Sequence, residues 1–483
     1  MSNDTRTLAP AFTDSLQWIN TDSPLTLDEL RGRIVLLNFT TYSSINCQHT
    51  LPDLRFLEKR FHDAITIIDI HCPKFRNEAE PEQLQKAINR LHIRRPVASD
   101  PQFEMWRAYG IKAWPSVIFI DAEGFVVGIL RGEGRVRQLE ELIQKYVAQA
   151  EMVGTLRRQK TPFDTIAEPS RPLYFPGSVC VSRNHLYISD SGRNRILETY
   201  HDGTVRRVFG SGSPDLLDGP ETGASFNSPQ GIIHVGDFLY VADTGNHVIR
   251  RIHLKSGEVM TLAGCGRIGR YVADKFKDPL QAELNSPLDL AFHESNLYIA
   301  MAGQHQIWRM NLNHLTIERY AGSGREDLVD GGGEVACFAQ PSGLTVMNDT
   351  LYVADADASA VRSIILSHNI VETLIGKGVF DFGDREGTGR EARLQYPLAV
   401  EADPERNALW IADTYNSRLK RLDLGTNQVT KFKFGHTLNE PGGLALFRNR
   451  LFIANTNAHE IVSLDLQSRD TEVVQIKEAA TEF

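Results

Sequence analysis

A repeat fills most of the chain and limits what the chain can fold into. Six segments each begin with a proline, continue into a short apolar strand pattern and then reach a polar turn, as in SPQGIIHVGDFLYVADTGNHVIRRI. They recur every 44 to 58 residues, and each holds three or four short strand patterns with no helical periodicity. The leading prolines are Pro176, Pro229, Pro287, Pro341, Pro397 and Pro441.

Repeats of this length that are built only from strands predict the blades of a β-propeller. Six segments therefore predict a six-bladed propeller over residues 173–483. A closed ring of blades leaves no long exposed sheet edge, so it is stable without a further domain to cover it.

The first part of the chain follows a different pattern. Strand patterns at 34–39 and 65–72 alternate with helical patterns at 51–61 and 81–91, and a hairpin pattern at 116–130 precedes a last helix at 136–150. This alternation predicts an α/β sandwich with a mixed sheet over residues 1–150. Residues 151–172 have weak periodicity, which is typical of a linker.

The segment NFTTYSSINCQHTLPDL, residues 38–54, resembles the active-site loop of the thioredoxin fold. Phe39 ends a strand pattern, and Ser44 stands five positions later, where that fold has its attacking cysteine. Cys47 takes the position of the second cysteine, and Pro52 matches the proline of the first helix. Pro115, in AWPSVIFI, matches the cis-proline that faces the loop. The resemblance implies a thioredoxin-like domain.

The serines change the chemistry of this loop. Disulfide exchange needs one thiolate that attacks and a second that resolves the mixed disulfide, so a Ser44–Cys47 pair cannot cycle. Ser44 is suited to capping the helix that follows, and Asn38 stands where many thioredoxins have a buried carboxylate. The candidate catalytic residues are Cys47, Ser44 and Ser43, and the predicted edge of the site comprises Tyr42, Trp114, Pro115, Pro52 and Cys72.

Two active alternatives remain open for this loop. Ser-x-x-Cys resembles the Thr-x-x-Cys arrangement of peroxiredoxins, in which the cysteine reacts with peroxide, although Thr40 stands where that family has a proline. Alternatively, Cys72 ends the strand pattern ITIIDIHC and could pair with Cys47, because strand ends of such sheets meet at the active-site edge. The simplest interpretation of Cys72 is a small buried hydrophobic residue.

The whole chain resembles one family. The segment ADTGNH at 242–247 and connectors such as GSGREDLVDGGGEVACFAQP resemble the NHL repeat. Together with the first domain, they resemble the NHL-repeat-containing proteins that have an N-terminal thioredoxin-like domain. Members typically read Tyr-Cys-Cys-Ile-Asn-Cys where this chain has YSSINC at 42–47. The resemblance implies descent from thiol-disulfide oxidoreductases. The signature aspartate of the repeat recurs as Asp190, Asp243, Asp355 and Asp413, and is replaced by Met301 and Asn455.

We interpret the recurring aspartates as structural, because a catalytic residue is not needed four times. A short acidic side chain accepts backbone N–H bonds in the turn that leaves a strand. His247, His305 and His459 also occupy equivalent repeat positions, which favours a structural role over a metal site. The repeats show no three-histidine or carboxylate cluster at the inner strand ends, which argues against an enzyme in the propeller channel.

The formal net charge is −9, and the acidic excess lies in residues 161–483. Nucleic-acid binders normally present a basic surface, so we expect no nucleic-acid partner. No run of 18 apolar residues and no signal-peptide pattern occur, so we expect a cytoplasmic protein without membrane association. The five scattered cysteines predict free thiols rather than a disulfide framework.

Three functions follow as hypotheses. The first is a thioredoxin-like domain of redox ancestry coupled to a propeller that binds a protein or peptide partner. The second is a non-catalytic scaffold that keeps the thioredoxin fold for its peptide groove. The third is a peroxidase-like or redox-sensing activity at Cys47 alone. None of the three needs a cofactor, and we expect none.

Overall fold

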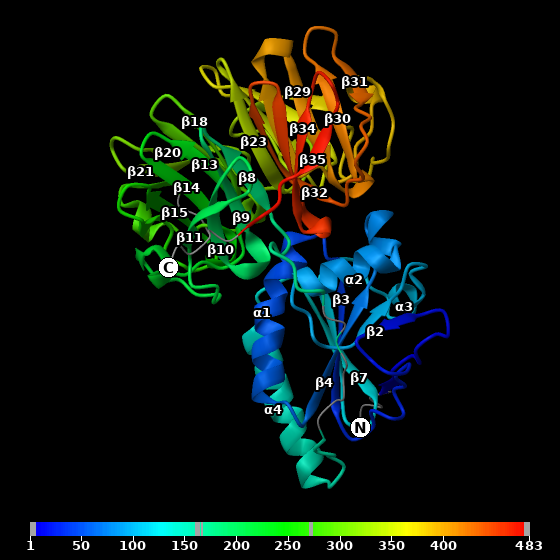
Figure 1. Ribbon diagram of the computed structural model, residues 1–483. Coiled ribbons are helices and arrows are strands. Elements are labelled where there is room, and N and C mark those ends of the chain that lie inside the picture. The colour runs from blue at the N-terminus through cyan, green and yellow to red at the C-terminus, as the bar shows by residue number, and fades with distance from the viewer. Residues whose placement is uncertain (1–5, 160–164, 166–167, 270–273, 478–483) are drawn as a thin grey trace. The chain divides into compact units, whose positions relative to one another are not determined.

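The computed structural model describes residues 6–159, 165, 168–269 and 274–477. Contacts divide the chain into two compact units, Met1–Pro169 and Ser170–Phe483 (Figure 1). Helix α4 ends at Met152 and strand β8 begins at Ser178, so the last helix and the first propeller strand lie on either side of residues 153–177. The boundaries expected at 150 and 172 stay a prediction.

The first unit is built on a mixed sheet, as the sequence predicted, and the described part of this sheet has seven strands. Its strand order is β1-β7-β6-β3-β4-β5-β2, with β3 parallel to β4 and antiparallel to β6. The strands are β1 (Thr7–Leu8), β2 (Gln17–Ile19), β3 (Ile34–Thr40), β4 (Ile65–His71), β5 (Val97–Ser99), β6 (Ser116–Ile120) and β7 (Phe125–Arg131).

Every residue of β3 and β4 is buried, because side chains of both strands enter a core on each face of the sheet. Leu37 and Phe39 face one core, and Leu36 faces the other, which α1 and α4 cover. These two helices contact each other along the sheet (Figure 1). The helices are α1 (Ile45–Arg60), α2 (Pro81–Arg90), α3 (Glu104–Ala108) and α4 (Val136–Met152).

Helix α1 begins earlier than the sequence predicted. The apolar pattern suggested a helix over 51–61, but the helix starts at Ile45 and therefore contains Cys47 in its first turn. The first turns, INCQHT, mix polar and buried residues, so their periodicity did not reveal them. The sulfur of Cys47 consequently lies close to the free backbone N–H groups at a helix N-terminus.

The second unit contains six antiparallel sheets, which are the six predicted blades. The first three are β8 (Ser178–Val181), β9 (His185–Asp190), β10 (Arg195–Tyr200) and β11 (Val205–Phe209); β12 (Gly219–Pro220), β13 (Pro229–Val235), β14 (Phe238–Asp243), β15 (Val248–His253) and β16 (Glu258–Ala263); and β17 (Lys275–Phe276), β18 (Pro287–His293), β19 (Asn296–Met301), β20 (Gln306–Asn311) and β21 (Thr316–Ala321). The last three are β22 (Gly331–Gly332), β23 (Pro341–Met347), β24 (Thr350–Asp355), β25 (Ala360–Ile365) and β26 (Ile370–Ile375); β27 (Gly387–Thr388), β28 (Ala399–Asp403), β29 (Ala408–Asp413), β30 (Arg418–Asp423) and β31 (Gln428–Lys431); and β32 (Pro441–Phe447), β33 (Arg450–Asn455), β34 (Glu460–Asp465) and β35 (Thr471–Val473).

The expectation of three or four strands in each blade is wrong for four of the six. In these blades a two-residue strand from the connector, β12, β17, β22 or β27, pairs with the outermost strand. In the second blade Gly219 pairs with Val259 and Pro220 with Glu258. The connectors are polar and glycine-rich, and each of these strands is only two residues long, so no apolar alternation predicted them.

The blades close into a ring. The inner strands contact one another in the order β8, β13, β18, β23, β28, β32 and back to β8. The chain end adds a second closure, because Val205 donates its N–H to the carbonyl of Lys477 at 2.8 Å and Lys477 donates to the carbonyl of Gly203 at 3.0 Å. Among the residues that the structure describes, no helix combines the length and apolar character needed to cross a membrane.

Candidate functional site

The loop between β3 and α1 places the two serines differently. Ser43 is fully buried, whereas Ser44 is partly exposed and occupies the N-cap position of α1 with φ −70° and ψ 122°. The Ser44 side chain makes no capping hydrogen bond, so the expected side-chain cap is wrong. Its hydroxyl instead interacts with the thiol of Cys47. Ser44 is therefore the position of this loop from which a side chain can reach both solvent and Cys47.

Cys47 is held as a neutral thiol. Its side chain is buried, and burial raises the pKa to about 11. The Thr40 and Ser44 hydroxyls and the Thr41 backbone N–H beside the sulfur lower the pKa, but they do not offset the loss of hydration. Because the thiolate is the nucleophile, Cys47 is a weak nucleophile near neutral pH.

The carboxylate of Glu78 holds the loop in place through hydrogen bonds. This role was not predicted from the sequence. The carboxylate is buried and accepts hydrogen bonds from the Ser43 N–H at 2.9 Å, from the Thr41 hydroxyl at 2.9 Å to each oxygen, and from the N–H groups of Lys74 and Phe75 at 3.0 Å. Burial alone would raise the Glu78 pKa, but these bonds and nearby His71 bring it below its ordinary value.

The signal for Glu78 was weak. It lies in KFRNEAE, a segment that carried the family resemblance, but its role depends on contacts with residues more than 30 positions away. A single glutamate in a polar segment is more often a surface residue than a buried anchor. Only the fold reveals that its carboxylate fixes the backbone of Ser43.

A second buried network lies beside the loop and contains Tyr42. The Asp69 carboxylate on β4 accepts hydrogen bonds from Asn38 at 2.8 Å and from the Tyr42 hydroxyl at 3.0 Å, and pairs with Arg95 at 3.2 Å. Arg95 also binds Glu58 of α1 at 2.7 Å. Position 38 therefore has no carboxylate, but Asp69 on the neighbouring strand provides one, and three donors hold it.

The Trp114–Pro115 peptide bond is cis, as the resemblance implied. The Trp114 ring packs against Trp106 at 4.7 Å and Phe103 at 6.3 Å between ring centroids, so the aromatic core holds it in part. Pro52 is exposed within α1, five residues beyond Cys47. At a rise of about 1.5 Å per residue it lies roughly 7–8 Å farther along the helix axis.

Cys72 lies at the same sheet edge as Cys47. It donates its N–H to the carbonyl of Thr40 at 2.9 Å, and its sulfur lies 3.7 Å from an Asp100 oxygen. Burial raises the Cys72 pKa, and Asp100 and Cys47 raise it further. Both cysteines are free thiols, like the other three in the chain. A redox pair between Cys47 and Cys72 stays a prediction.

The signature position of the repeats does structural work in all six blades. The side chain there accepts the N–H of the residue two positions before the leading proline of the same blade, at 2.6–2.8 Å for the oxygen acceptors. In the third blade the sulfur of Met301 takes the acceptor position at 3.3 Å. The structural interpretation of the aspartates is therefore confirmed.

The second oxygen of each signature aspartate binds a cation within the same blade. Each aspartate has one basic partner, at 2.7 to 3.3 Å: Asp190–Arg195, Asp243–Arg250, Asp355–Arg362 and Asp413–Lys420. Where Asn455 replaces the aspartate, the partner is Glu460 at 2.7 Å, and where Met301 replaces it, Gln306 binds the Trp308 indole at 3.0 Å. The pairing partner changes together with the signature residue.

The three equivalent histidines link adjacent blades. Nδ1 of His247, His305 and His459 accepts the N–H of the residue that precedes a leading proline of the next blade, at 3.0, 3.1 and 3.0 Å. In the other blades an asparagine or serine takes the same role. We call these six contacts the inter-blade bonds, and their acceptors are Asn194, His247, His305, Ser359, Ser417 and His459. Within the described residues no group of three or more His, Cys, Asp or Glu side chains is arranged to hold a metal ion.

Comparison with known proteins agrees with this architecture. Residues 6–129 match the model of the AhpC/TSA family. The chain is 36% identical over 97% of its length to NHL repeat-containing protein 2 of Bos taurus, of which it covers 72%. It is 36% identical over 99% of its length to the Arabidopsis thaliana protein SUPPRESSOR OF QUENCHING 1, chloroplastic, of which it covers 48%. Over 29% of its length it is 20% identical to the thiol-disulfide oxidoreductase YkuV of Bacillus subtilis, of which it covers 95%.

A thioredoxin-like domain followed by a six-bladed NHL-type propeller defines the class of this protein. The extent and identity of the match go further, and show that the chain belongs to the family of NHL repeat-containing protein 2.

Proposed function

We propose that this chain is a non-cycling relative of the thiol-disulfide oxidoreductases, in which a thioredoxin-like domain is coupled to a propeller that binds a protein or peptide partner. The observation that carries the proposal is the loop itself. Ser44 takes the position of the attacking thiol, and Cys47 is buried with a pKa of about 11. Such a loop keeps the shape of a substrate-binding edge but lacks the second sulfur that exchange needs.

The test restores the missing sulfur at one serine and uses the other serine as its control. Ser44 is partly exposed and interacts with Cys47, whereas Ser43 is buried on Glu78. A thiol at position 44 can attack a substrate disulfide, and Cys47 can then resolve the mixed disulfide. We expect Ser44→Cys to reduce insulin with dithiothreitol as the electron donor, and we expect the unchanged chain and Ser43→Cys to remain at the uncatalysed rate.

The opposite results would overturn the proposal. Catalysed insulin reduction by the unchanged chain would mean that Cys47 acts with another group, of which Cys72 is the first candidate, and Cys72→Ser would then abolish the activity. If a Ser44→Cys variant folds but forms no disulfide with Cys47, the loop does not have the geometry of a dithiol site.

A single-cysteine peroxidase is the alternative that the three donors around the Cys47 sulfur favour. The raised pKa argues against it, because peroxide reacts with the thiolate. Consumption of hydrogen peroxide that depends on Cys47, with Cys72→Ser unaffected, would replace our proposal with this one. The cytoplasmic location and the absence of a nucleic-acid partner stay predictions.

A further inference from the structure

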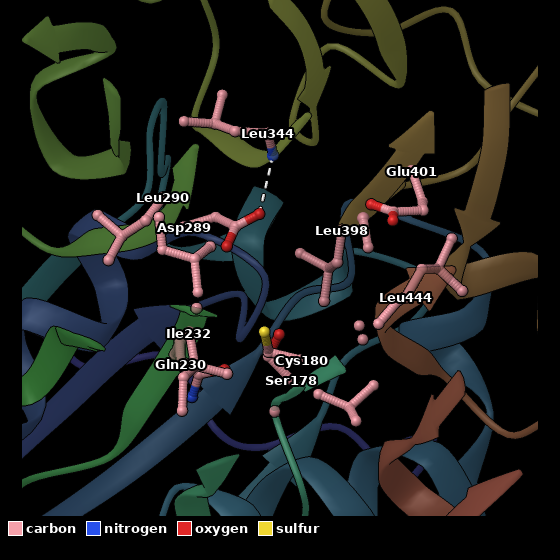
Figure 2. A pocket seen from close by; sticks show the side chains of 18 of the residues that line it. Ser178, Cys180, Gln230, Ile232, Asp289, Leu290, Leu344, Leu398, Glu401 and Leu444 are labelled. Atoms are coloured by element: carbon pink, nitrogen blue, oxygen red, sulfur yellow. Dashed lines mark hydrogen bonds between the residues drawn. The ribbon is translucent and has the colours of Figure 1, made fainter. Parts of the chain in front are cut away.

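The inner strands of the propeller surround a cavity of about 210 Å³ (Figure 2). Residues from all six blades line it, and its wall is mixed, with slightly more polar than apolar surface. Figure 2 shows Leu290, Leu344, Leu398 and Leu444 around the space, with the carboxylates of Asp289 and Glu401 among them. The cavity therefore combines leucine side chains with two acidic groups, which is a combination typical of a small-ligand site.

The two carboxylates are fixed on different blades. Asp289 of β18 accepts the N–H of Leu344 at 2.8 Å, and Glu401 of β28 accepts the N–H of Leu446 at 3.0 Å. Each bond runs from one blade to the next, so it sets the position of the carboxylate in the wall. Both side chains are partly exposed, so small solutes can contact their remaining lone pairs.

The repeat does not require either acid. The position of Asp289, two residues after the leading proline, is glycine in three blades; a side chain at Gly231, for example, would collide with the Asp289 carboxylate. The position of Glu401, four residues after Pro397, holds Cys180, Ile233, Ala291, Thr345 or Ala445 in the other blades. The two carboxylates are therefore specific to this cavity and do not belong to the repeated pattern of the blades.

No basic residue occurs among the described residues that line the cavity. Each of the four signature aspartates of this propeller has a lysine or arginine partner. Burial raises the pKa of Asp289 to about 7 and that of Glu401 to about 8, and Asp289 contributes to the rise at Glu401. The remaining titratable group in the wall, Cys180, has a pKa that burial raises to about 12, so it is a neutral thiol.

We propose that the channel cavity binds a small aliphatic ammonium compound, and that a diamine suits it best. One ammonium group would bind the Asp289 carboxylate and the other the Glu401 carboxylate, while the methylene chain contacts the leucines. A divalent metal ion fits less well, because it prefers six or more oxygen ligands and the lining offers two carboxylates with apolar neighbours.

The test is calorimetric titration of the full chain with 1,4-diaminobutane at pH 8.5 and low salt. We expect saturable binding with one diamine per chain, and no binding of butane-1,4-diol, which has the same chain without charge. Asp289→Asn and Glu401→Gln should each weaken binding by about tenfold or more, the effect of losing one charge-assisted hydrogen bond. Both amides keep an oxygen that can accept the backbone N–H. Glu258→Gln, a change of an exposed acid on β16, should leave the affinity unchanged.

Thermal melts of the unchanged chain give a second measurement that needs no variant. The diamine should raise the melting temperature at pH 8.5 and have no effect at pH 5, where both carboxyls are protonated. Absence of saturable binding, an equal loss in Glu258→Gln, or the same shift at both pH values would overturn the proposal. Displacement of the diamine by micromolar magnesium chloride would overturn it in favour of a metal site.

Discussion

The six blade turns and the single loop at Ser43–Ser44 respond differently to a changed residue. In the propeller, each departure from the signature comes with a changed partner: Asn455 has Glu460, and Met301 has neutral Gln306 nearby. In the thioredoxin-like domain, the serines leave Cys47 without a second sulfur, while Glu78 still holds the loop backbone. The propeller turns keep the same kind of interaction with different residues. The loop keeps its backbone conformation but lacks the pair of thiols that disulfide exchange needs.

The largest effect is expected where a blade loses its paired signature. Asp243→Ala removes one of two carboxylate partners of Arg250, which is fully buried and also pairs with Asp218 at 3.0 Å. It also removes the acceptor of the Asn227 N–H. Removing one side of a buried ion pair together with a backbone acceptor costs about 3–5 kcal/mol. We expect the free energy of unfolding to fall by that amount, as measured with urea and the fluorescence of Trp308 and Trp410. A loss below about 1 kcal/mol would contradict the structural role of the signature.

A substitution that restores the signature should also destabilise the protein. Met301→Asp creates the consensus residue in the third blade, but Trp308 stands in the place that Arg250 and Arg362 take in their blades. We expect a loss of about 2–4 kcal/mol at pH 8, because a buried carboxylate without a partner is costly.

Met301→Asn is the matched control, since it has the same shape without the charge and the sixth blade already uses asparagine. Burial will raise the pKa of the new carboxyl above its unfolded value, so the added instability of the aspartate over the asparagine should appear as pH rises and vanish near pH 4. Equal stability of the two variants at pH 8 would mean that the basic partner is not required.

On the thioredoxin-like side, Glu78→Gln should cost about 2–3 kcal/mol. The amide keeps one acceptor oxygen but turns an NH₂ group toward some of the four donors that Glu78 now accepts. Unfolding monitored by far-ultraviolet circular dichroism and by the fluorescence of Trp106 and Trp114 would measure the loss. An unchanged stability would mean that the loop holds its shape without this anchor.

The smallest effect is expected at an inter-blade bond. His459→Ala removes the acceptor of the Phe175 N–H at the junction that closes the ring, and should cost about 1–2 kcal/mol. His459→Asn should cost less than half as much, because Asn194 already fills the equivalent position with its side-chain oxygen. If asparagine and alanine destabilise the protein equally, the bond itself contributes little.

The repeats explain why so much of the propeller could be predicted from the sequence. Six copies reveal which positions recur, and so the blades, their leading prolines and the structural role of Asp243 and His247 were accessible. The two-residue strands such as β12 were not, because a strand of two residues is too short to show an alternating pattern. The single-copy site offered only resemblance, which located Cys47 and Pro115 but missed Glu78 and the start of α1.

The missing cap at Ser44 could not be predicted from the local sequence either. A serine before a helix usually accepts a backbone N–H, but here the Ser44 hydroxyl interacts with the buried thiol of Cys47 instead. The channel carboxylates were missed as well, because Asp289 and Glu401 occupy different repeat positions in different blades. Their proximity depends on ring closure, which no local pattern reports.

The most direct test of the central claim is the pH dependence of Cys47 alkylation by iodoacetamide, followed by mass spectrometry of the peptide that contains it. The background is Cys72→Ser, so that the second buried thiol does not contribute. We predict no inflection below pH 9, because the pKa lies near 11. A rate that titrates with a midpoint below the ordinary thiol value of about 8.5 would contradict the account and show an activated sulfur.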